Sequence, residues 1–390
     1  MNDNKMVPEI RFKDYTSAWE QRKLGEVAEF SNEKRIPIDA ALRTSGEYPY
    51  YGATGIIDYV HDYIFDGEYV LLAEDGANII ARSSPIAYLA SGKFWLNNHA
   101  HIMRMKAGNN NFLLQLLEKQ NYLSLNTGTA QPKLNAQVLK GMTLNFPAPE
   151  EQTAIGHFFA TLDKTITLYK QKLDGLKTLK KGYLQQMFPQ AGESVPKVRF
   201  AGFSGEWEGK ALGEMLTERN EQIEESEEYP LMSFVGNVGV VPKGEQYDRS
   251  FLVKGADKKY KKTELNDFIY SSNNLETGSI GFNRTGNAVI SPVYSIFYSN
   301  NDSESQFVGL LSKRKDFINK MIHYRQGVMY GQWRIHEKDF LKITVLSPST
   351  AEQNKIIQFF HTIDEQITAQ SQKVEQIQQL KKAYLQKMFI

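Results

Sequence analysis

Two short strings hold residues that could bind a metal ion or cleave a phosphodiester bond. His99 and His101 alternate, so a strand would present both imidazoles on one face. A zinc site needs three or four ligands, and no further ligand cluster lies near in the sequence. Glu74-Asp75 could be a nuclease fragment, but Asp75-Gly76 is more typical of a turn. We therefore expect hydrogen-bonded histidines and a turn here.

Motifs for nucleotide hydrolysis and base methylation are incomplete. The string from Gly205 to Ala211 is nearest to a phosphate-binding loop, but its spacing is wrong and it lacks the hydroxyl that would hold magnesium. Ser291-Pro292-Val293-Tyr294 resembles the Asn-Pro-Pro-Tyr strip of base methyltransferases, without the glycine-rich cofactor loop. No serine or cysteine nucleophile motif is visible. The sequence favours a chain without catalysis or cofactor of its own.

Other strings suit contact with DNA. Gln131-Pro132-Lys133 and Gln332-Trp333-Arg334 each combine an amide, which can read adenine edges, with a cation, which can hold guanine or phosphate. A structural turn is the alternative for both. A lysine run around Tyr260 could neutralise phosphates, and a solvated charged loop is its alternative. The run comprises Lys254, Lys258, Lys259, Lys261 and Lys262.

The elements that would position these residues form an internal repeat. Residues 8–12 match residues 196–200, which lie 188 positions later, and residues 151–188 match residues 352–389, which lie 201 positions later. Between the matched segments the halves look unrelated, apart from the two amide–cation strings. Sequence drift of the two copies after a gene duplication is one explanation for this dissimilarity. A common frame that holds two inserts with different tasks better explains the sharp boundaries.

The later matched segment predicts one long helix in each half, because apolar residues recur at steps of three and four. Ser349 and Glu352 form a capping-box pattern at the second helix. Each helix could run about 38 residues, or roughly 57 Å, and its narrow apolar stripe needs a partner, which the other copy can supply. Gln370, in the place of Tyr169, could set the register or occupy a tolerated edge position. The predicted interface comprises Ile155, Phe158, Leu162, Ile166, Leu173 and Leu176 in the first helix and Ile356, Phe359, Ile363, Ile367, Val374 and Ile377 in the second.

The inserts, about residues 21–146 and 209–345, mix turn signals with short apolar runs, which predicts a mixed α+β class. A turn is predicted at residues 236–239. Helices are expected at Phe112–Glu118 and Phe317–Tyr324. Strands are expected at Tyr69–Leu72, Ile79–Ala81, Phe268–Tyr270, Val289–Ile290 and Val293–Phe297.

The composition narrows the class of protein. A chain of 390 residues with 41% hydrophobic and 23% charged residues is ordinary for a soluble globular protein of about two domains. The absence of cysteine excludes disulfides and cysteine-ligated zinc. No long apolar run or secretory signal is visible, so we expect a cytoplasmic protein. The net charge of +1 suggests that any grip on nucleic acid is shared with partner subunits.

Several strings, in this order, resemble the specificity subunit of type I restriction-modification enzymes, and the resemblance covers essentially the whole chain in two copies. Each string alone is a weak signal, but their repeated order is specific. The first half carries Leu24-Gly-Glu, Tyr50-Tyr-Gly-Ala-Thr-Gly, Trp95-Leu-Asn-Asn-His-Ala-His, Gly128-Thr-Ala-Gln-Pro-Lys-Leu and Pro149-Glu-Glu-Gln. The second half carries Leu212-Gly-Glu, Gly331-Gln-Trp-Arg-Ile and Ala351-Glu-Gln.

The resemblance implies two target-recognition domains, residues 1–148 and 191–347, separated by two long antiparallel coiled-coil helices, residues 149–190 and 348–390. Each domain would read one half of a bipartite, asymmetric site in double-stranded DNA. The helices would set the gap and dock two modification subunits that methylate adenine with S-adenosylmethionine. Restriction subunits would add ATP- and Mg-dependent translocation and cleavage.

The candidate DNA-contacting residues combine the strings above with the Tyr50 string. The second domain lacks the Trp-Leu-Asn-Asn-His-Ala-His string, so its base-reading residues cannot be transferred from the first. A stand-alone DNA-binding regulator and a scaffold whose inserts bind no DNA are the alternatives. The candidates are Gln131, Lys133, Gln332, Arg334, Lys258, Lys259, Lys261, Lys262, Tyr50 and Thr54.

Overall fold

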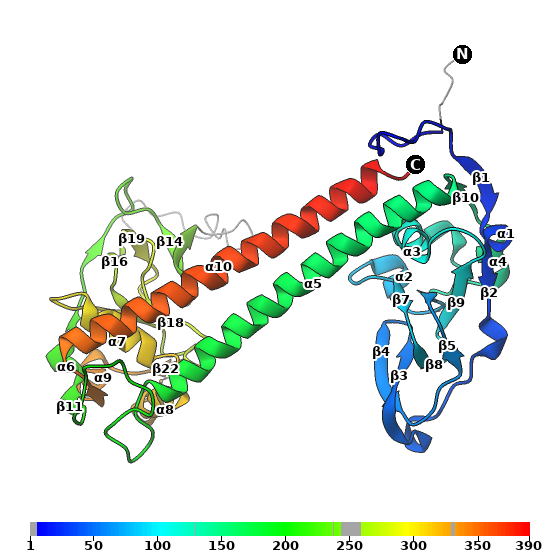
Figure 1. Cartoon of the computed structure of the whole chain (residues 1–390). Coiled ribbons are helices and arrows are strands. Elements are labelled where there is room, and N and C mark those ends of the chain that lie inside the picture. The colour runs from blue at the N-terminus through cyan, green and yellow to red at the C-terminus, as the bar shows by residue number, and fades with distance from the viewer. Residues whose placement is uncertain (1–5, 129, 237, 243–258, 329–331) are drawn as a thin grey trace. The chain divides into compact units, whose positions relative to one another are not determined.

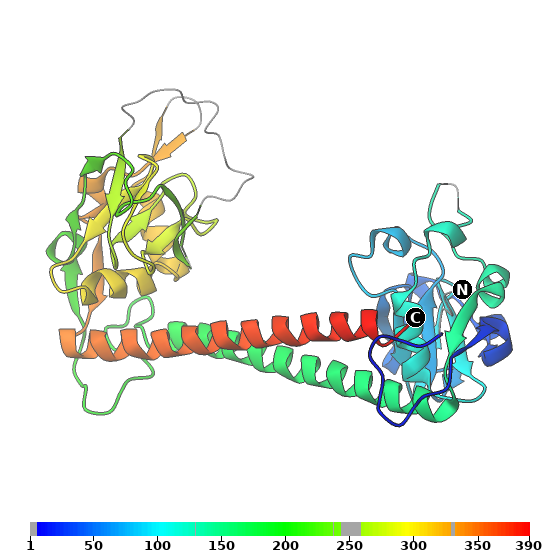
Figure 2. The same ribbon diagram turned by 90° about the horizontal axis from the view of Figure 1, so that it is seen from above.

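The structure, a computed structural model, describes residues 6–128, 130–236, 238–242, 259–328 and 332–390. The chain divides into two compact units, and each takes part of the two long helices α5 (Pro149–Gln186) and α10 (Thr350–Lys387). Unit 1 comprises Met1–Gln171 and Gln370–Ile390, and unit 2 comprises Lys172–Ala369. Both helices are drawn as unbroken ribbons in Figure 1 and, from above, in Figure 2. Each has the predicted 38 residues.

Unit 1 contains two four-stranded sheets, ordered β2-β9-β6-β7 and β4-β3-β8-β5. Side chains of β6 alternate in direction: Val70 and Leu72 belong to the core that includes α3, whereas Leu71 belongs to a second core with Phe65 and Phe94. Both faces of β6 are therefore buried, which explains its continuous apolar sequence. The elements are β1 (Glu20–Lys23), α1 (Leu24–Val27), β2 (Ala28–Phe30), β3 (Ser45–Gly52), β4 (Gly55–Val60), β5 (Phe65–Asp66), β6 (Tyr69–Ala73), α2 (Asn78–Ala81), β7 (Ala87–Ala90), β8 (Lys93–Leu96), β9 (Ala100–Met105), α3 (Asn110–Lys119), α4 (Ala136–Gly141) and β10 (Thr143–Phe146), with 3-10 turns at Asn32–Lys34, Ala40–Leu42 and Leu123–Leu125.

Unit 2 uses the same entry and exit but a different sheet arrangement. Its described strands form the sheets β12-β20-β17-β18 and β13-β16-β19 and three two-stranded ladders. The elements are β11 (Glu208–Ala211), α6 (Leu212–Met215), β12 (Thr217–Glu218), β13 (Gln222–Ile223), β14 (Met232–Val235), β15 (Gly239–Pro242), β16 (Tyr260–Thr263), β17 (Phe268–Tyr270), β18 (Ile280–Phe282), β19 (Ala288–Ile290), β20 (Ser295–Tyr298), α7 (Ser303–Leu311), α8 (Lys315–His323), β21 (Gln326–Val328), β22 (Gln332–Arg334), α9 (Glu337–Phe340) and β23 (Thr344–Ser347). The mixed fold class predicted from the sequence is confirmed.

Most of the local predictions hold, with two corrections. Residues Ile79–Ala81 form part of helix α2 rather than a strand, and only Ile79 of its two isoleucines is buried, while Ile80 is 44% exposed. At α10, Ser349 Oγ accepts the Glu352 amide at 3.4 Å, as a capping box requires, but the Glu352 carboxylate pairs with Arg199. The predicted turn at residues 236–239 joins β14 to β15, with residue 237 outside the described part.

The frame is anchored in the same way in both units. In unit 1, Arg11 donates two hydrogen bonds of 2.6 Å to the buried carboxylate of Glu151. Arg199 and Glu352 repeat this pair in unit 2 at 2.7 Å. Aromatic contacts repeat as well: Phe389 stacks on Phe112 in the core of unit 1 at a centroid distance of 5.3 Å, and its repeat partner Phe188 packs against Phe307 in unit 2 at 5.6 Å. Residues from near the end of α10 therefore complete the core of unit 1.

Antiparallel contacts between the two helices occur within each unit. In unit 1, Lys381 donates to Asp163 at 2.6 Å, and buried Gln370 donates to the Tyr169 carbonyl at 3.0 Å. Of the predicted interface residues, the buried ones are Ile155, Ile166, Leu173, Ile356, Ile363 and Val374. The partly buried ones are Phe158, Leu162, Leu176, Phe359, Ile367 and Ile377. Gln370 thus makes a contact that depends on register, as a polar residue in a seam can.

Candidate nucleic-acid interface

In unit 1, three segments that are far apart in the sequence meet around the turn Glu74–Gly76. The Glu74 amide donates to the His99 carbonyl at 2.9 Å, and the Leu134 amide donates to the Glu74 carbonyl at 2.7 Å. The Gly76 amide donates to the Pro132 carbonyl at 3.0 Å. These backbone bonds place the predicted Gln131–Lys133 string beside the histidine string.

Glu74 is the charged centre of this arrangement. Arg35 Nη1 lies 2.6 Å and Lys133 Nζ 3.4 Å from its carboxylate oxygens. Burial raises the pKa of Glu74, but the hydrogen bond from Arg35 and the positive charge of Arg35 outweigh burial and hold this pKa below its usual value. Glu74 therefore stays ionised and orients both cations.

The histidines are hydrogen-bonded, as the sequence predicted. His101 is buried, and its Nε2 lies 2.8 Å from the Leu134 carbonyl, which can only accept. Its Nδ1 then accepts from Asn32 at 2.9 Å, and burial lowers its pKa, so the neutral imidazole fits both contacts. His99 is 52% exposed and contacts Asp75 at 2.9 Å. Among the described residues, no group of three ligands could hold a metal ion.

The candidate residues of unit 1 differ in accessibility. Gln131 is exposed, and the side chain of Lys133 is 52% exposed, so both can meet a ligand. Thr54 is exposed in the turn between β3 and β4. Tyr50 is only 1% exposed; its hydroxyl accepts from the Ile38 amide at 3.0 Å, and the Arg43 guanidinium covers its ring. The prediction of Tyr50 as a base contact is therefore corrected: the buried side chain supports the domain instead.

In unit 2, the aligned string lies in strand β22. Trp333 is 49% exposed, its amide donates to Asn273 Oδ1 at 2.6 Å, and its ring lies 5.9 Å from the Arg325 guanidinium. Arg325 is fixed by two bonds of 2.8 and 2.7 Å to Glu276. The side chain of Arg334 is 57% exposed. Gln332 contributes to the strand, and its side chain lies outside the described part.

Sequence reasoning missed Asn273 and Arg325 because both lie outside the Gln-Trp-Arg string, 60 and 8 positions before Trp333. The only signal in the sequence is that asparagine and arginine side chains can form hydrogen bonds. The exposed indole beside an immobilised guanidinium offers stacking and cation–π contacts to a ligand, whereas the equivalent position of unit 1 holds Pro132, which has no aromatic ring.

The lysine run needs a correction. Lys258, like Lys254, lies outside the described residues, and Lys259 is exposed. Strand β16 is the central strand of its sheet, so Lys261 is 7% exposed, and Lys262 pairs with Glu221 at 3.3 Å and Glu264 at 3.0 Å. Hydrogen bonding to Glu264 raises the pKa of Lys262. These two lysines therefore serve the fold of unit 2 rather than a free phosphate-binding surface.

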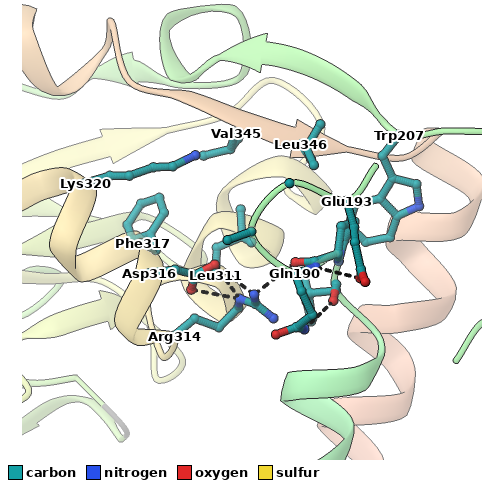
Figure 3. A pocket seen from close by; sticks show the side chains of 14 residues that line it. Gln190, Glu193, Trp207, Leu311, Arg314, Asp316, Phe317, Lys320, Val345 and Leu346 are labelled. Carbon is teal, nitrogen blue, oxygen red and sulfur yellow. Dashed lines mark hydrogen bonds and ion pairs between the residues drawn. The ribbon is translucent and has the colours of Figure 1, made fainter. Parts of the chain in front are cut away.

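A pocket of about 320 Å³ lies in unit 2 where the chain leaves α5 (Figure 3). Its cations are already engaged: Arg314 pairs with Asp316 at 2.8 Å and donates to the Pro189 carbonyl at 3.1 Å, and Lys320 donates to the Thr344 carbonyl at 3.0 Å. Figure 3 shows the Arg314–Asp316 contact as dashed lines among the side chains that line the pocket. We assign this pocket to packing of the frame against the domain.

The model of the type I restriction modification DNA specificity domain matches residues 16–178 and again residues 204–379. The chain belongs to this family. The two matches follow the repeat seen in the sequence.

In the described residues, no helix is both long and apolar enough to cross a membrane.

Individual relatives agree with this assignment. A putative type I restriction enzyme specificity subunit of Haemophilus influenzae is 40% identical over 137 residues, which are 35% of each chain. A putative type I specificity subunit of Mycoplasma pneumoniae is 25% identical over 157 residues, 39% of this chain and 42% of that protein. These matches thus span less than half the length of either relative. The crystal structure of a type I restriction-modification S subunit from M. genitalium has the same fold, with a TM-score of 0.69, 15% identity and 99% coverage of both chains.

Proposed function

We propose that this chain reads the DNA sequence for a type I restriction-modification complex, and that each unit reads one half of a bipartite, asymmetric site. One observation carries the proposal: the same repeat position presents exposed polar or aromatic groups in both units, in unlike surroundings. Unit 1 presents Gln131 and Lys133, and unit 2 presents Trp333 and Arg334. Both strings keep an amide and a cation, but Pro132 of unit 1 is replaced by the exposed ring of Trp333 in unit 2, and this difference suits two half-sites of different sequence.

We further propose that the long helices set the gap between the half-sites. A helix of 38 residues is roughly 57 Å long at 1.5 Å per residue. Half-sites one turn of DNA apart need centres about 34–36 Å apart, which lies within that length. Methylation, with S-adenosylmethionine, and ATP- and Mg-dependent cleavage would belong to partner subunits.

The test is a map of N6-methyladenine in cells with and without the gene, by single-molecule sequencing. We expect a split sequence that is methylated only when the gene is present together with modification subunits. An unchanged methylation map would contradict the proposal. Tight, sequence-specific binding by the purified chain alone, without any methylation, would instead support a stand-alone regulator.

Docking of the modification subunits would use exposed apolar residues that recur in the repeat. Leu179 on α5 and Leu380 on α10 occupy equivalent positions and are each 47% exposed. In unit 2, Leu179 lines a groove of about 680 Å³ together with Tyr183, Phe200 and Phe359. Because the two exposed leucines occupy equivalent positions of the repeat, they suit the binding of two copies of one partner.

We predict that Leu179→Asp weakens binding of one modification subunit by at least about tenfold, since burying a leucine is worth roughly 1.5–3 kcal/mol. Combining it with Leu380→Asp should remove both subunits. Native mass spectrometry of the copurified complex would count them. Leu168→Asp is the matched control, because Leu168 is 54% exposed but its repeat position holds Ala369. Full binding of two subunits by the double variant would exclude this surface.

A further inference from the structure

Two cations of unit 2 contact one carboxylate, and a third cation lies near it. Lys180 of α5 pairs with Asp364 of α10, and Arg284, from the loop between β18 and β19, donates to the same carboxylate at 2.9 Å. Lys313, between α7 and α8, lies near the charges of both Lys180 and Asp364. We call these four residues the Asp364 cluster. With all three cations protonated, its charge is +2.

The equivalent place in unit 1 carries no such excess. Asp163 accepts from Lys381 at 2.6 Å and from the neutral amide of Gln115 at 3.0 Å. The joint between domain and helices therefore needs one lysine and one uncharged donor there. The insert of unit 2 replaces that donor with Arg284 and adds Lys313, although the frame's own Asp–Lys pair is the same in both units.

The extra charge is unfavourable for the unliganded protein. Burial, together with the charges of Lys180 and Arg284, lowers the pKa of Lys313 to about 7, and the charge of Asp364 only partly opposes these effects. Among the described residues, the buried Arg284 Nε also has no hydrogen-bond partner. A bound anion would both neutralise the charge and accept these donors.

A phosphate group matches this cluster better than a second carboxylate does. Its oxygens can accept from several donors at once, as converging lysine and arginine side chains require. The proposed ligand of the chain is a polyanion with one phosphate charge per nucleotide. The cluster contains no amide that could read adenine edges, and Asp364 already orients the two cations that could otherwise hold a guanine.

We propose that the Asp364 cluster binds a phosphate group of the DNA backbone, and so holds the duplex without reading its sequence. This inference rests on the proposed function. It assigns to Lys313 and Arg284 an effect on affinity for every DNA sequence and no effect on which sequence is methylated. Free inorganic phosphate has the same chemistry, so the experiment must separate these two sources.

The experiment uses the full chain in complex with its modification subunits, on DNA with and without the methylated sequence. The dissociation constant is measured by fluorescence anisotropy between about 50 and 200 mM salt. We expect Lys313→Met and Arg284→Gln to weaken binding to both DNAs equally and to lower the log–log salt slope by about 0.9 for one lost phosphate contact. The methylated sequence should not change. Lys315→Gln removes the same charge from an exposed side chain two residues away and should keep the wild-type slope.

A second readout shows that a weakened variant is folded. The groups that face Lys313 are Lys180 on α5, Arg284 on the β18–β19 loop and Asp364 on α10. Because the folded pKa of about 7 lies below the ordinary value of 10.5, the unfolded chain binds more protons between these pH values. The unfolding free energy of the DNA-free chain should therefore rise with pH across this window, and Lys313→Met should abolish the rise while leaving the protein at least as stable at pH 7.

Each of the other possible results of these experiments would contradict the proposed phosphate contact. Unchanged affinity and slope in both variants would overturn the inference alone, whereas a wild-type complex that binds no DNA would overturn it together with the proposed function. Stabilisation of the DNA-free chain by inorganic phosphate that depends on Lys313, with an unchanged DNA slope, would assign the cluster to free phosphate and overturn the DNA contact. Loss of modification-subunit binding without DNA would identify an acidic protein partner and also overturn it.

Discussion

Replacing residues 21–146 with the corresponding segment of another family member will change one half of the methylated sequence and leave the other half intact. Methylation at the original sequence should fall to background, because both half-sites must be matched. The structure supports this boundary, since β1 and β10 pair with Glu20 opposite Phe146 and Lys23 opposite Thr143. The segment thus enters and leaves the frame through adjacent strands. Mapping N6-methyladenine before and after the exchange gives the result.

The exchange has a structural requirement and a reciprocal control. The incoming segment must supply an aromatic residue in place of Phe112, because this ring stacks on Phe389 of the frame. Exchange of residues 209–345, bounded by the β11–β23 ladder, should change only the other half of the sequence. A change in both halves after the first exchange would contradict independent reading by the two units.

Arg199→Ala should destabilise unit 2 by about 3–5 kcal/mol, since it leaves a buried carboxylate without its partner. The Glu352 side chain is 1% exposed and accepts both of its short bonds from Arg199. Hydrogen exchange followed by mass spectrometry would report the effect as faster exchange of unit 2 amides, with unit 1 amides unaffected.

Two variants test whether burial causes this effect. Arg11→Ala removes the equivalent bond to Glu151 and should move the loss of protection to unit 1. Lys342→Ala breaks an exposed pair with Asp339, which solvent screens, and should leave amide exchange in both units close to that of the wild type. Equal small effects of all three variants would contradict the role given to the buried pairs.

The sequence predicts well what depends on local periodicity and on the repeat. Apolar residues spaced three and four positions apart predicted the length of both long helices, and the repeat predicted where the inserts lie. The strand at Ile79 failed because a run of three apolar residues does not distinguish a buried strand from one turn of helix. Tertiary structure decides between them: Ile79 is buried in the core of unit 1, and its amide donates to the Gly76 carbonyl at 3.2 Å.

The candidate site was less predictable, because accessibility depends on pairing between distant segments. Tyr50 and Lys261 have residue types that suit DNA contact, yet both are buried by strands that the sequence does not align with them. Arg325 and Asn273 support Trp333 from 8 and 60 positions away in the sequence. Such contacts arise from tertiary structure and leave no local pattern.

The burial of Phe389 in the core of unit 1 has a consequence for synthesis on the ribosome. Domains usually fold in the order in which they emerge, from the N-terminus onward. Here unit 2 is one continuous stretch of chain, whereas unit 1 needs residues 370–390 as well as its N-terminal part. The N-terminal unit must therefore keep part of its apolar surface uncovered during translation until Phe389 has emerged, and the unit made later can finish folding first.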